Sequence, residues 1–560
     1  MNTTRAETAT VSLLLALVAA IVLGPHIRDG GFYIDDWSNA SYRAFAEPPA
    51  IVDTARTIWD VLESRPLLAL ALATPHVLFG LNPALHLALA AFLAVLLSLL
   101  LHAVLRTLGW PLVHAAAVAA LVLLFPWSDS TRLWATAGVN QLAVCAYLGG
   151  LLLAFRAISR PGSAALHAAS IGLYLASVLL YEIAAAAIVA SGVLYQRFGE
   201  TRATRARWAL DLVFVGTATL YAAAHTRRVG AADAGDLAEY VPRFARSIAS
   251  VIGRAAVPVG PPELGVAALV LVLAIGAALA WSADPQIDER TELRRWVSIA
   301  AAAVPAIALA YVMFVPAAYW DATWPGLMNR VNLLGALPIV VLVHSAVMTA
   351  ATLAAPKRRR TRVLLASTAV VLLALGYARL VTQDAARYRE AAQRQEEVLL
   401  RLREATPKPP SGSTVYTFGH VNQVAPNVPV FSTTWDLRSA ARLLWDDPTL
   451  MAYPTYRGTM FRCRLQRLEP AAPWPPYDLG GFGLDREHGA AYGHAVFVDV
   501  AAGTSVRIRS RAQCRRARRD FRPGPFLASE ELTARQPADP LGRAARPRRP
   551  QPRHARRPRV

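Results

Sequence analysis

The stretch 85–101 reads LHLALAAFLAVLLSLLL, and it decides the fold class because its apolar residues run almost without a break. A transmembrane β-strand would alternate polar and apolar residues, whereas a membrane-spanning helix needs about 20 mostly apolar residues in succession. Residues 11–23 have the same character. Hydrophobic residues make up 54% of the 560-residue chain and charged residues 17%, which indicates a polytopic membrane protein rather than a soluble enzyme or a disordered chain.

Apolar blocks of this kind recur along the first 380 residues and predict an all-α bundle of about eleven membrane-spanning helices. The blocks lie at 9–24, 83–105, 112–126, 139–155, 164–180, 183–195, 208–225, 261–281, 297–315, 331–350 and 362–378. The segment 164–195 is long for one span and short for two. We interpret it as two spans that turn at Tyr181 and Glu182, because a single span would place later basic loops on the wrong side of the membrane.

Charge predicts the orientation of these spans. Alternate loops are basic, and the positive-inside rule places such loops in the cytoplasm. We therefore expect a protein of the cell (plasma or inner) membrane with a cytoplasmic N-terminus and a C-terminal domain outside. The first block lacks a basic start and a small-residue cleavage site, so we interpret it as a retained span rather than a signal peptide.

Composition changes after the last block and predicts four parts. These are a transmembrane catalytic bundle over 1–380, a connecting helix or linker over 381–411, a small extramembrane α+β domain over 412–534 and a tail over 535–560. The α+β assignment rests on strand-like runs such as 413–418 and 495–500 between turns rich in Pro and Gly. The tail is Arg, Pro and Ala and cannot bury a core, so we expect it to be disordered. It either binds anionic lipid headgroups or another polyanion, or has no function.

The first loop, residues 30–39, reads GGFYIDDWSN and places Asp35 and Asp36 side by side just past a membrane span. A carboxylate at a low-dielectric boundary is costly unless a cation, a metal or a reacting proton uses it. The alternative is a solvated loop in which an Asp caps the following helix. The chain contains no Cys-x-x-Cys, His-Glu-x-x-His or P-loop string, which excludes the common zinc-hydrolase and nucleotide-binding motifs.

Further motifs follow the acidic pair in order along the chain. They are ESRPLL at 63–68, LFGLNP at 78–83 followed by His86, FPWSD at 125–129 followed by Trp134, Tyr181-Glu182, and MNRVN at 328–332. Together with the acidic pair, this order resembles the GT-C superfamily of polytopic glycosyltransferases, and in particular the branch similar to protein O-mannosyltransferases. Tyr181 departs from the Lys that usually stands in the family's Lys-Glu turn.

The resemblance implies transfer of a hexosyl or pentosyl unit from a polyprenyl-phosphate donor to an acceptor hydroxyl on the outer face of the membrane. The acceptor is a glycan, a glycolipid or a protein. A donor activated in this way needs a general base for the acceptor proton and cations for the phosphate leaving group. The reaction requires no nucleotide or nucleic acid. Whether it uses a divalent cation is left undecided. The residues implied are Asp35 as base, Asp36 as its orienting neighbour, Arg65 and Arg330 on the phosphate, and Asp129 and Glu182 in the substrate site.

Purely structural roles are also possible for several of these residues. Arg65 and Arg330 also suit interface anchors at span ends, and Asp129 suits a helix cap. His76 and His86 suit packing better than metal ligation, since no third ligand is evident. The sequence leaves undecided whether Cys463 and Cys514 form a disulfide. We interpret Cys145 as a small apolar core residue.

Two other functions compete with the transferase. A transporter or flippase of lipid-linked sugars would be expected to show internal repeats, which are not found in the sequence. A non-enzymatic scaffold gives no reason for the acidic pair and the arginines on one predicted face.

Overall fold

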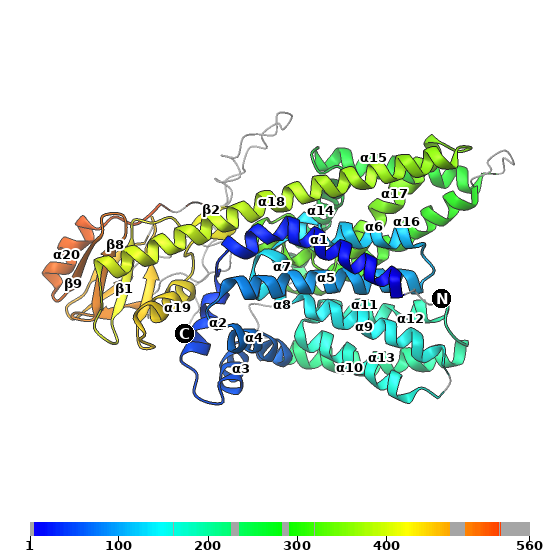
Figure 1. Ribbon diagram of the computed structural model, residues 1–560. Helices are drawn as coiled ribbons and strands as arrows, with labels where there is room; N and C mark the ends of the chain where they lie inside the picture. The colour runs from blue at the N-terminus through cyan, green and yellow to red at the C-terminus, as the bar shows by residue number, and fades with distance from the viewer. Residues whose placement is uncertain are drawn as a thin grey trace.

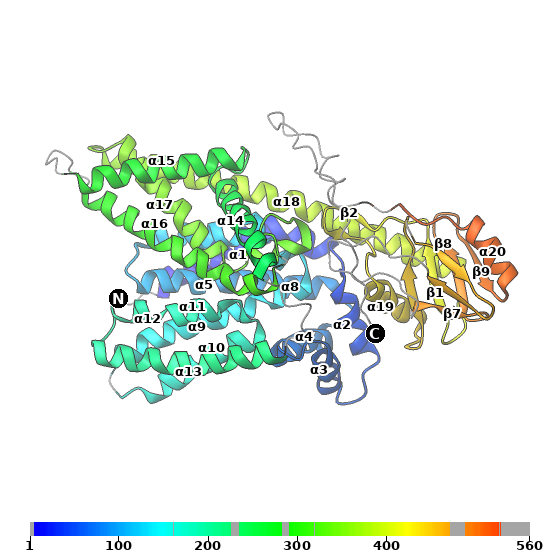
Figure 2. The same ribbon diagram turned by 180° about the vertical axis from the view of Figure 1, so that it is seen from behind.

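The computed structural model describes residues 5–527 apart from 161, 226–233, 283–289, 319, 458, 471–487 and 526. A bundle of long helices lies at one end of the molecule and a small domain of strands and helices at the other (Figures 1 and 2). This agrees with the predicted helical bundle and C-terminal α+β domain. The predicted tail 535–560 and part of the predicted domain lie outside the described residues.

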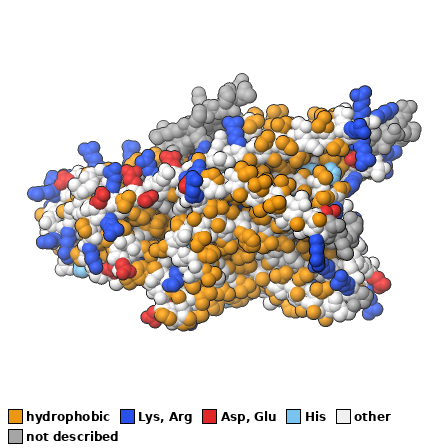
Figure 3. All heavy atoms as spheres, viewed as in Figure 1, with side chains coloured by type: hydrophobic (Ala, Val, Ile, Leu, Met, Phe, Trp, Pro, Cys, Tyr) orange, Lys and Arg blue, Asp and Glu red, His pale blue; other side chains and the backbone are white. Residues whose placement is uncertain are grey.

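Seven of the described helical segments are long and apolar enough to cross a membrane, so the chain is a multi-pass membrane protein. They are α1 (Arg5–Asp29), α5 (Pro83–Thr107), α8 with α9 (Ala135–Ile158), α15 (Pro262–Trp281), α16 with η3 (Arg290–Ala317), α17 (Ala336–Ala354) and α18 (Arg359–Ala405). Helix α1 shows why they suit lipid: it buries Leu15 and Leu23 against the bundle while Leu13, Leu17 and Ile21 stay exposed. Figure 3 shows hydrophobic side chains spread over the middle of the bundle.

The predicted count of about eleven spans remains a prediction. The other apolar helices are shorter: α4 (Pro66–Phe79), α6 (Leu112–Leu123), α10 (Ala164–Leu180) and the segment Glu182–Tyr195, which comprises η2 (Glu182–Ala184), α11 (Ala185–Ala190) and α12 (Gly192–Tyr195). A helix of 12 residues such as α6 is about 18 Å long, less than the roughly 30 Å of a hydrocarbon core. Helix α13 (Thr201–His225) covers the remaining predicted span. Helix α10 ends at Leu180 and η2 begins at Glu182, so a helix break lies at the predicted turn.

Helix α18 connects the bundle to the C-terminal domain. It has 47 residues and runs without a break through the predicted last span and the predicted connecting helix. Within the bundle the Tyr377 hydroxyl donates to the Ala255 carbonyl at 2.6 Å. Further along, the Gln395 amide donates to the Val430 carbonyl at 2.5 Å. One helix therefore fixes the position of the domain relative to the bundle.

The C-terminal domain is built on a four-stranded sheet in the order β4-β1-β8-β9. Strands β4 (Met451–Pro454), β1 (Thr414–Phe418) and β8 (Ala495–Asp499) are parallel, and β9 (Thr504–Ile508) is antiparallel to β8. Successive residues of β1 face opposite sides of this sheet, as strand geometry requires. Val415 packs with α18 and α19 (Thr434–Trp445), whereas Tyr416 and Phe418 pack with α20 (Arg511–Asp520).

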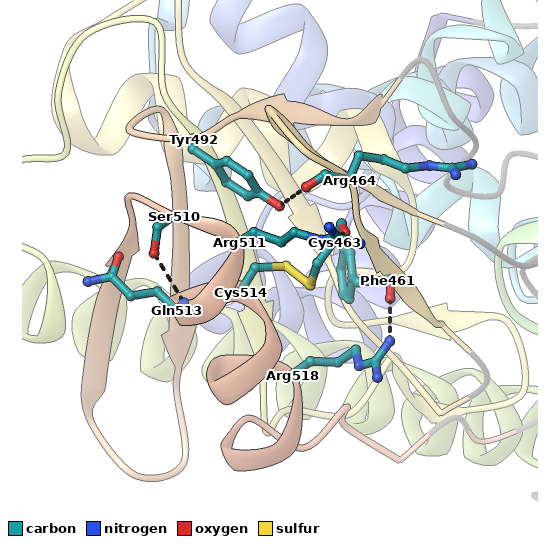
Figure 4. The surroundings of a disulfide bond; sticks show 9 residues. All are labelled: Phe461, Cys463, Arg464, Tyr492, Ser510, Arg511, Gln513, Cys514 and Arg518. Carbon is teal, nitrogen blue, oxygen red and sulfur yellow. Dashed lines mark hydrogen bonds between the residues drawn. A yellow bond between two sulfur atoms is a disulfide. The ribbon is translucent and has the colours of Figure 1, made fainter.

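Smaller elements complete the domain and its contact with the bundle. Strands β2 (Gln423–Ala425) and β3 (Val428–Pro429) form a hairpin, and β5 (Phe461–Cys463), β6 (Arg467–Pro470) and β7 (Ala490–Ala491) form a second sheet. A disulfide between Cys463 and Cys514 ties β5 to α20 (Figure 4). Helices α2 (Asp35–Ala44), α3 (Ala50–Val61) and α4 lie at the end of the bundle that faces this domain (Figure 1).

Candidate functional site

The two adjacent carboxylates of the first loop have different surroundings. Asp36 is fully buried, and both of its oxygens accept hydrogen bonds. Oδ2 accepts from the Tyr33 N–H at 3.0 Å, and Oδ1 accepts from the N–H and the hydroxyl of Thr136 at 2.8 and 2.6 Å. Burial raises the pKa of Asp36 to about 7, although these hydrogen bonds favour the charged form. Asp36 therefore fastens the first loop to α8.

Asp35 occupies the first position of α2 and is only partly buried. Among the described residues, the donor found for its carboxylate is the Trp435 indole, whose Nε1–H donates to Oδ1 at 2.9 Å. Burial raises the pKa of Asp35, while the charge of Arg330 and the indole hydrogen bond oppose that shift. Asp35 thus keeps an oxygen for which no donor is found among the described residues, whereas both oxygens of Asp36 accept hydrogen bonds from the protein.

Ile34, directly before this pair, has a φ of 42°, in the left-handed region. A β-branched residue rarely adopts this conformation, which costs on the order of 1–3 kcal/mol. The neighbouring contacts hold it there, because Asp36 binds the Tyr33 N–H and the Trp134 indole donates to the Tyr33 carbonyl at 3.1 Å. The strain is local to the segment that positions both carboxylates.

Arg330 approaches the same region from η4 (Gly326–Asn332). Its guanidinium carbon lies 5.2 Å from the ring centre of Trp134 and 5.1 Å from that of Trp320. One Nη1–H donates to the Leu327 carbonyl at 2.9 Å, and no ion pair to it is found among the described residues. Two aromatic faces hold the cation in place without neutralising it. Its charge acts on both Asp35 and Tyr181.

Arg65 and Glu182, predicted separately as substrate contacts, bind each other. Arg65 Nε and Nη2 donate to the two Glu182 oxygens at 2.9 and 2.6 Å, and the guanidinium lies 4.5 Å from the Tyr181 ring centre. The side chains are 27% and 24% exposed. The fork of Arg65 is therefore occupied by a carboxylate, whereas no ion pair to Arg330 is found among the described residues.

Asp129 is also fully buried, in the loop between η1 (Pro126–Ser128) and α7 (Ser130–Leu133). Its Oδ1 accepts from the Asn329 amide at 2.6 Å, one residue before Arg330. Burial and the nearby Asp384 carboxylate raise the pKa of Asp129 well above its ordinary range. A carboxyl whose neutral form is favoured in this way is better suited to positioning η4 than to carrying charge to a substrate. Sequence reasoning did not find Asp384, which lies on α18.

The structure therefore brings all six predicted site residues to the same end of the bundle. Asp36 reaches Thr136, Trp134 stacks against Arg330, and Asn329 connects Arg330 to Asp129. The charge of Arg330 extends to Tyr181, beside the pair of Arg65 and Glu182. Segments up to about 300 residues apart in the chain contribute to this cluster.

The C-terminal domain contributes residues that the motif reading missed. Helix α19 lies along α2: Trp435 bonds Asp35, and the Ser439 hydroxyl lies 3.4 Å from that of Ser38. One turn on from Trp435, Arg438 acts electrostatically on Tyr42 of α2. The Thr433 and Asp436 capping box was a readable helix signal, but no local pattern shows that α19 packs on α2.

His76 and His86 lie with their ring centres 4.3 Å apart, and both contact Phe32. In the part of the chain that the structure describes, no three His, Cys, Asp or Glu side chains come together to hold a metal ion. A groove of about 310 Å³ runs beside the first loop. It is lined by residues that include Gly31, Phe32, Trp37, Gln393, Glu396 and Leu399.

No family model matches the chain, and a search of curated proteins found no match. The solved structures that are similar to it include two of ArnT from Cupriavidus metallidurans. The apo structure is 16% identical with a TM-score of 0.34, and the structure bound to undecaprenyl phosphate is 15% identical with a TM-score of 0.33. Each comparison covers 79% of this chain and 85% of the other.

Proposed function

We propose that this protein is an integral membrane glycosyltransferase that moves a sugar from a polyprenyl-phosphate donor to an acceptor hydroxyl. The observation that carries the proposal is the pairing of a partly buried carboxylate, Asp35, with a cation held between two indoles, Arg330. Both lie at the end of an apolar helical bundle, where a lipid donor would present its phosphate. The ordered motifs around them resemble the GT-C superfamily.

In the proposed reaction Asp35 removes the proton of the acceptor hydroxyl. The acceptor oxygen forms a bond to the anomeric carbon while the bond from that carbon to the phosphate oxygen breaks. Arg330 stabilises the negative charge that collects on the departing polyprenyl phosphate, since a guanidinium matches two phosphate oxygens at once. A single displacement of this kind inverts the configuration at the anomeric carbon.

The other residues position these two. Asp36 holds the first loop against α8, and the Trp435 indole orients the Asp35 carboxylate. Asp129 supports η4 through Asn329, and Arg65 with Glu182 joins the start of α4 to η2. We assign these last three residues to the walls of the site and not to direct contact with the phosphate.

We further propose that the bundle lies in the cell membrane with its N-terminus in the cytoplasm and the C-terminal domain outside. The alternation of basic loops supports this orientation, and so does the disulfide between Cys463 and Cys514, because disulfides persist in oxidising compartments. The acceptor would then be a glycan, glycolipid or protein hydroxyl on the outer face.

Comparison of lipid extracts tests the proposal. Cells without the gene should accumulate a polyprenyl-phosphate sugar, and the wild-type gene should remove it. Asp35→Asn should fail to do so at equal expression, because an amide keeps the shape but does not accept the proton; a loss of at least 10²-fold in transfer is expected. Asp446→Asn is the matched control, since Asp446 is exposed and its left-handed conformation suits Asn. Absence of any accumulated lipid, or full complementation by Asp35→Asn, would overturn the assignment.

A further inference from the structure

The far end of the C-terminal domain carries a dense arginine surface that the proposed reaction does not use. Residues 504–522 hold eight arginines and one acidic residue, Asp520. Five of the arginines lie on α20, and all eight are exposed. They are Arg507, Arg509, Arg511, Arg515, Arg516, Arg518, Arg519 and Arg522. We call this set the α20 surface; Figure 3 shows basic side chains gathered at this end of the molecule.

The α20 surface is held rigidly. Cys514 and Ala517 are buried on the inner side of α20, and the disulfide ties Cys514 to Cys463 of β5. Figure 4 shows two further links: Arg511 Nε–H donates to the Cys463 carbonyl and Arg518 Nη1–H to the Phe461 carbonyl, both at 3.1 Å. Arg511 and Arg518 thus turn toward β5, whereas the exposed Arg515, Arg516 and Arg519 form a ladder of cations on a fixed helix that rises about 5.4 Å per turn.

The surface stands well away from the predicted membrane. The Ser505 hydroxyl of β9 donates to the Ala405 carbonyl at 2.6 Å, which places the strand before α20 at the last turn of α18. The predicted span ends near residue 378, and the rest of α18 extends about 40 Å beyond it. Attraction between exposed charges fades over a Debye length of about 8 Å at physiological salt. Lipid headgroups are thus a poor partner for this surface.

We infer that the α20 surface binds a linear anionic glycan, through carboxylate or phosphate groups repeated along the chain. This inference rests on the proposed function, because the glycan would be the acceptor or the polymer that carries it. A ladder of cations matches a chain with repeated charges better than a single ion. The ion pairs found in the described part of this domain join Arg464 and Arg467 to Glu469, and none involves α20.

Docking on α20 would raise the local concentration of acceptor near the site. The same rigid domain that carries α20 also carries Trp435, which contacts Asp35. A polymer held at one end of the domain is therefore tethered to the body that completes the proposed active site, and tethering converts the second encounter into an effectively intramolecular one.

Binding of polygalacturonate, a linear polycarboxylate, to the full-length protein in nanodiscs of neutral lipid tests the inference. The variant Arg515→Gln/Arg516→Gln/Arg519→Gln should weaken binding at least tenfold at low salt. The control Arg202→Gln/Arg359→Gln/Arg360→Gln removes the same charge from exposed arginines elsewhere and should change binding less than twofold. Wild-type binding should weaken as salt rises, and neutral dextran should not bind.

Three outcomes would overturn the inference: undiminished binding by the α20 variant, tighter binding of vesicles containing phosphatidylglycerol than of polygalacturonate, or tighter binding of single-stranded DNA. The result is separable from the proposed function. Asp35→Asn should still bind polygalacturonate as the wild type does, so a failure of transfer and a failure of docking are seen in different variants.

Discussion

At the scale of single residues, the two adjacent carboxylates differ because only one has its hydrogen-bonding capacity filled by the protein. Asp36 accepts three hydrogen bonds from Tyr33 and Thr136, whereas the donor found for Asp35 is one indole N–H. Adjacent residues at the start of a helix point in different directions, so one serves the fold and the other faces the site. The proposed general base is thereby distinguished from its neighbour by environment and not by residue type.

The raised pKa of Asp36 predicts a pH-dependent contribution to stability. Between an unfolded pKa near 4 and a folded value of about 7, the folded state binds more protons than the unfolded state, so this contribution falls as pH rises through that window, by at most about 4 kcal/mol. Asp36→Asn does not titrate. The difference in melting temperature, wild type minus variant, should therefore shrink from pH 5 to pH 8 in detergent. A difference that grows over that range would contradict the buried environment described for Asp36.

The pairing of Arg65 with Glu182 predicts coupled effects on stability. Arg65→Gln and Glu182→Gln should each destabilise the protein by leaving a partly buried partner unpaired, and the double variant should lose less than the sum, with a coupling of about 1 kcal/mol. Thermal unfolding of the four proteins in detergent measures this. Strictly additive losses, together with a rise in donor KM for Arg65→Gln alone, would instead indicate that Arg65 binds the donor phosphate.

At the scale of elements, α19 and α18 determine which side chain of the C-terminal domain contacts the first loop. Helix α19 begins with a capping box in which the side chains of Thr433 and Asp436 each accept a hydrogen bond from the other's backbone N–H. This fixes the position of Trp435 in the first turn. Helix α18 continues unbroken for 47 residues and sets the position of α19 against α2. The C-terminal domain is therefore part of the proposed site rather than an appendage of the bundle.

Trp435→Phe tests that role. Phe keeps an aromatic ring but removes the N–H that favours the charged form of Asp35, so the pKa of Asp35 should rise further. Because the base must be ionised to act, the acid limb of the kcat/KM profile should move to higher pH. Trp445→Phe removes an indole hydrogen bond to the Thr406 carbonyl at the other end of α19 and serves as the control. An unshifted limb in Trp435→Phe would show that the indole does not tune the base.

At the scale of the whole molecule, the chain separates an apolar bundle from a charged domain. The exposed faces of α1 and α15 are apolar, whereas α20 and its neighbours are basic. This division is consistent with the proposed reaction, in which a lipid donor would reach the site from the bundle and a water-soluble acceptor from the C-terminal domain.

Cysteine labelling in intact cells tests the proposed orientation. Cys463 and Cys514 are joined and Cys145 is buried, so a membrane-impermeant maleimide should label the protein only after treatment with an impermeant reductant. A Cys463→Ser/Cys514→Ser variant should stay unlabelled throughout. Labelling that requires permeabilised cells would place the C-terminal domain in the cytoplasm and reverse the topology.

Local composition alone determined the helical class, the membrane location and the existence of a separate C-terminal domain with strands. A continuous apolar block has few alternatives to a helix, because each buried backbone N–H and C=O group needs a hydrogen-bond partner and a helix supplies one within the same segment. Composition does not determine the number of spans. Helices α6 and α10 are apolar enough to predict spans, but tertiary contacts set where each helix ends and therefore how long it is.

Tertiary structure alone decided which predicted site residues face one another. Arg65 and Glu182 are 117 positions apart, and Trp435 and Asp35 are 400 apart, so no spacing rule predicts that each pair meets. Asp129 looked like a charged contact, yet burial beside Asp384 of α18 favours its neutral form. Motifs report which chemical groups are available. Whether a carboxylate becomes a base, an anchor or half of an ion pair depends on the donors and charges that folding brings within a few ångströms of it.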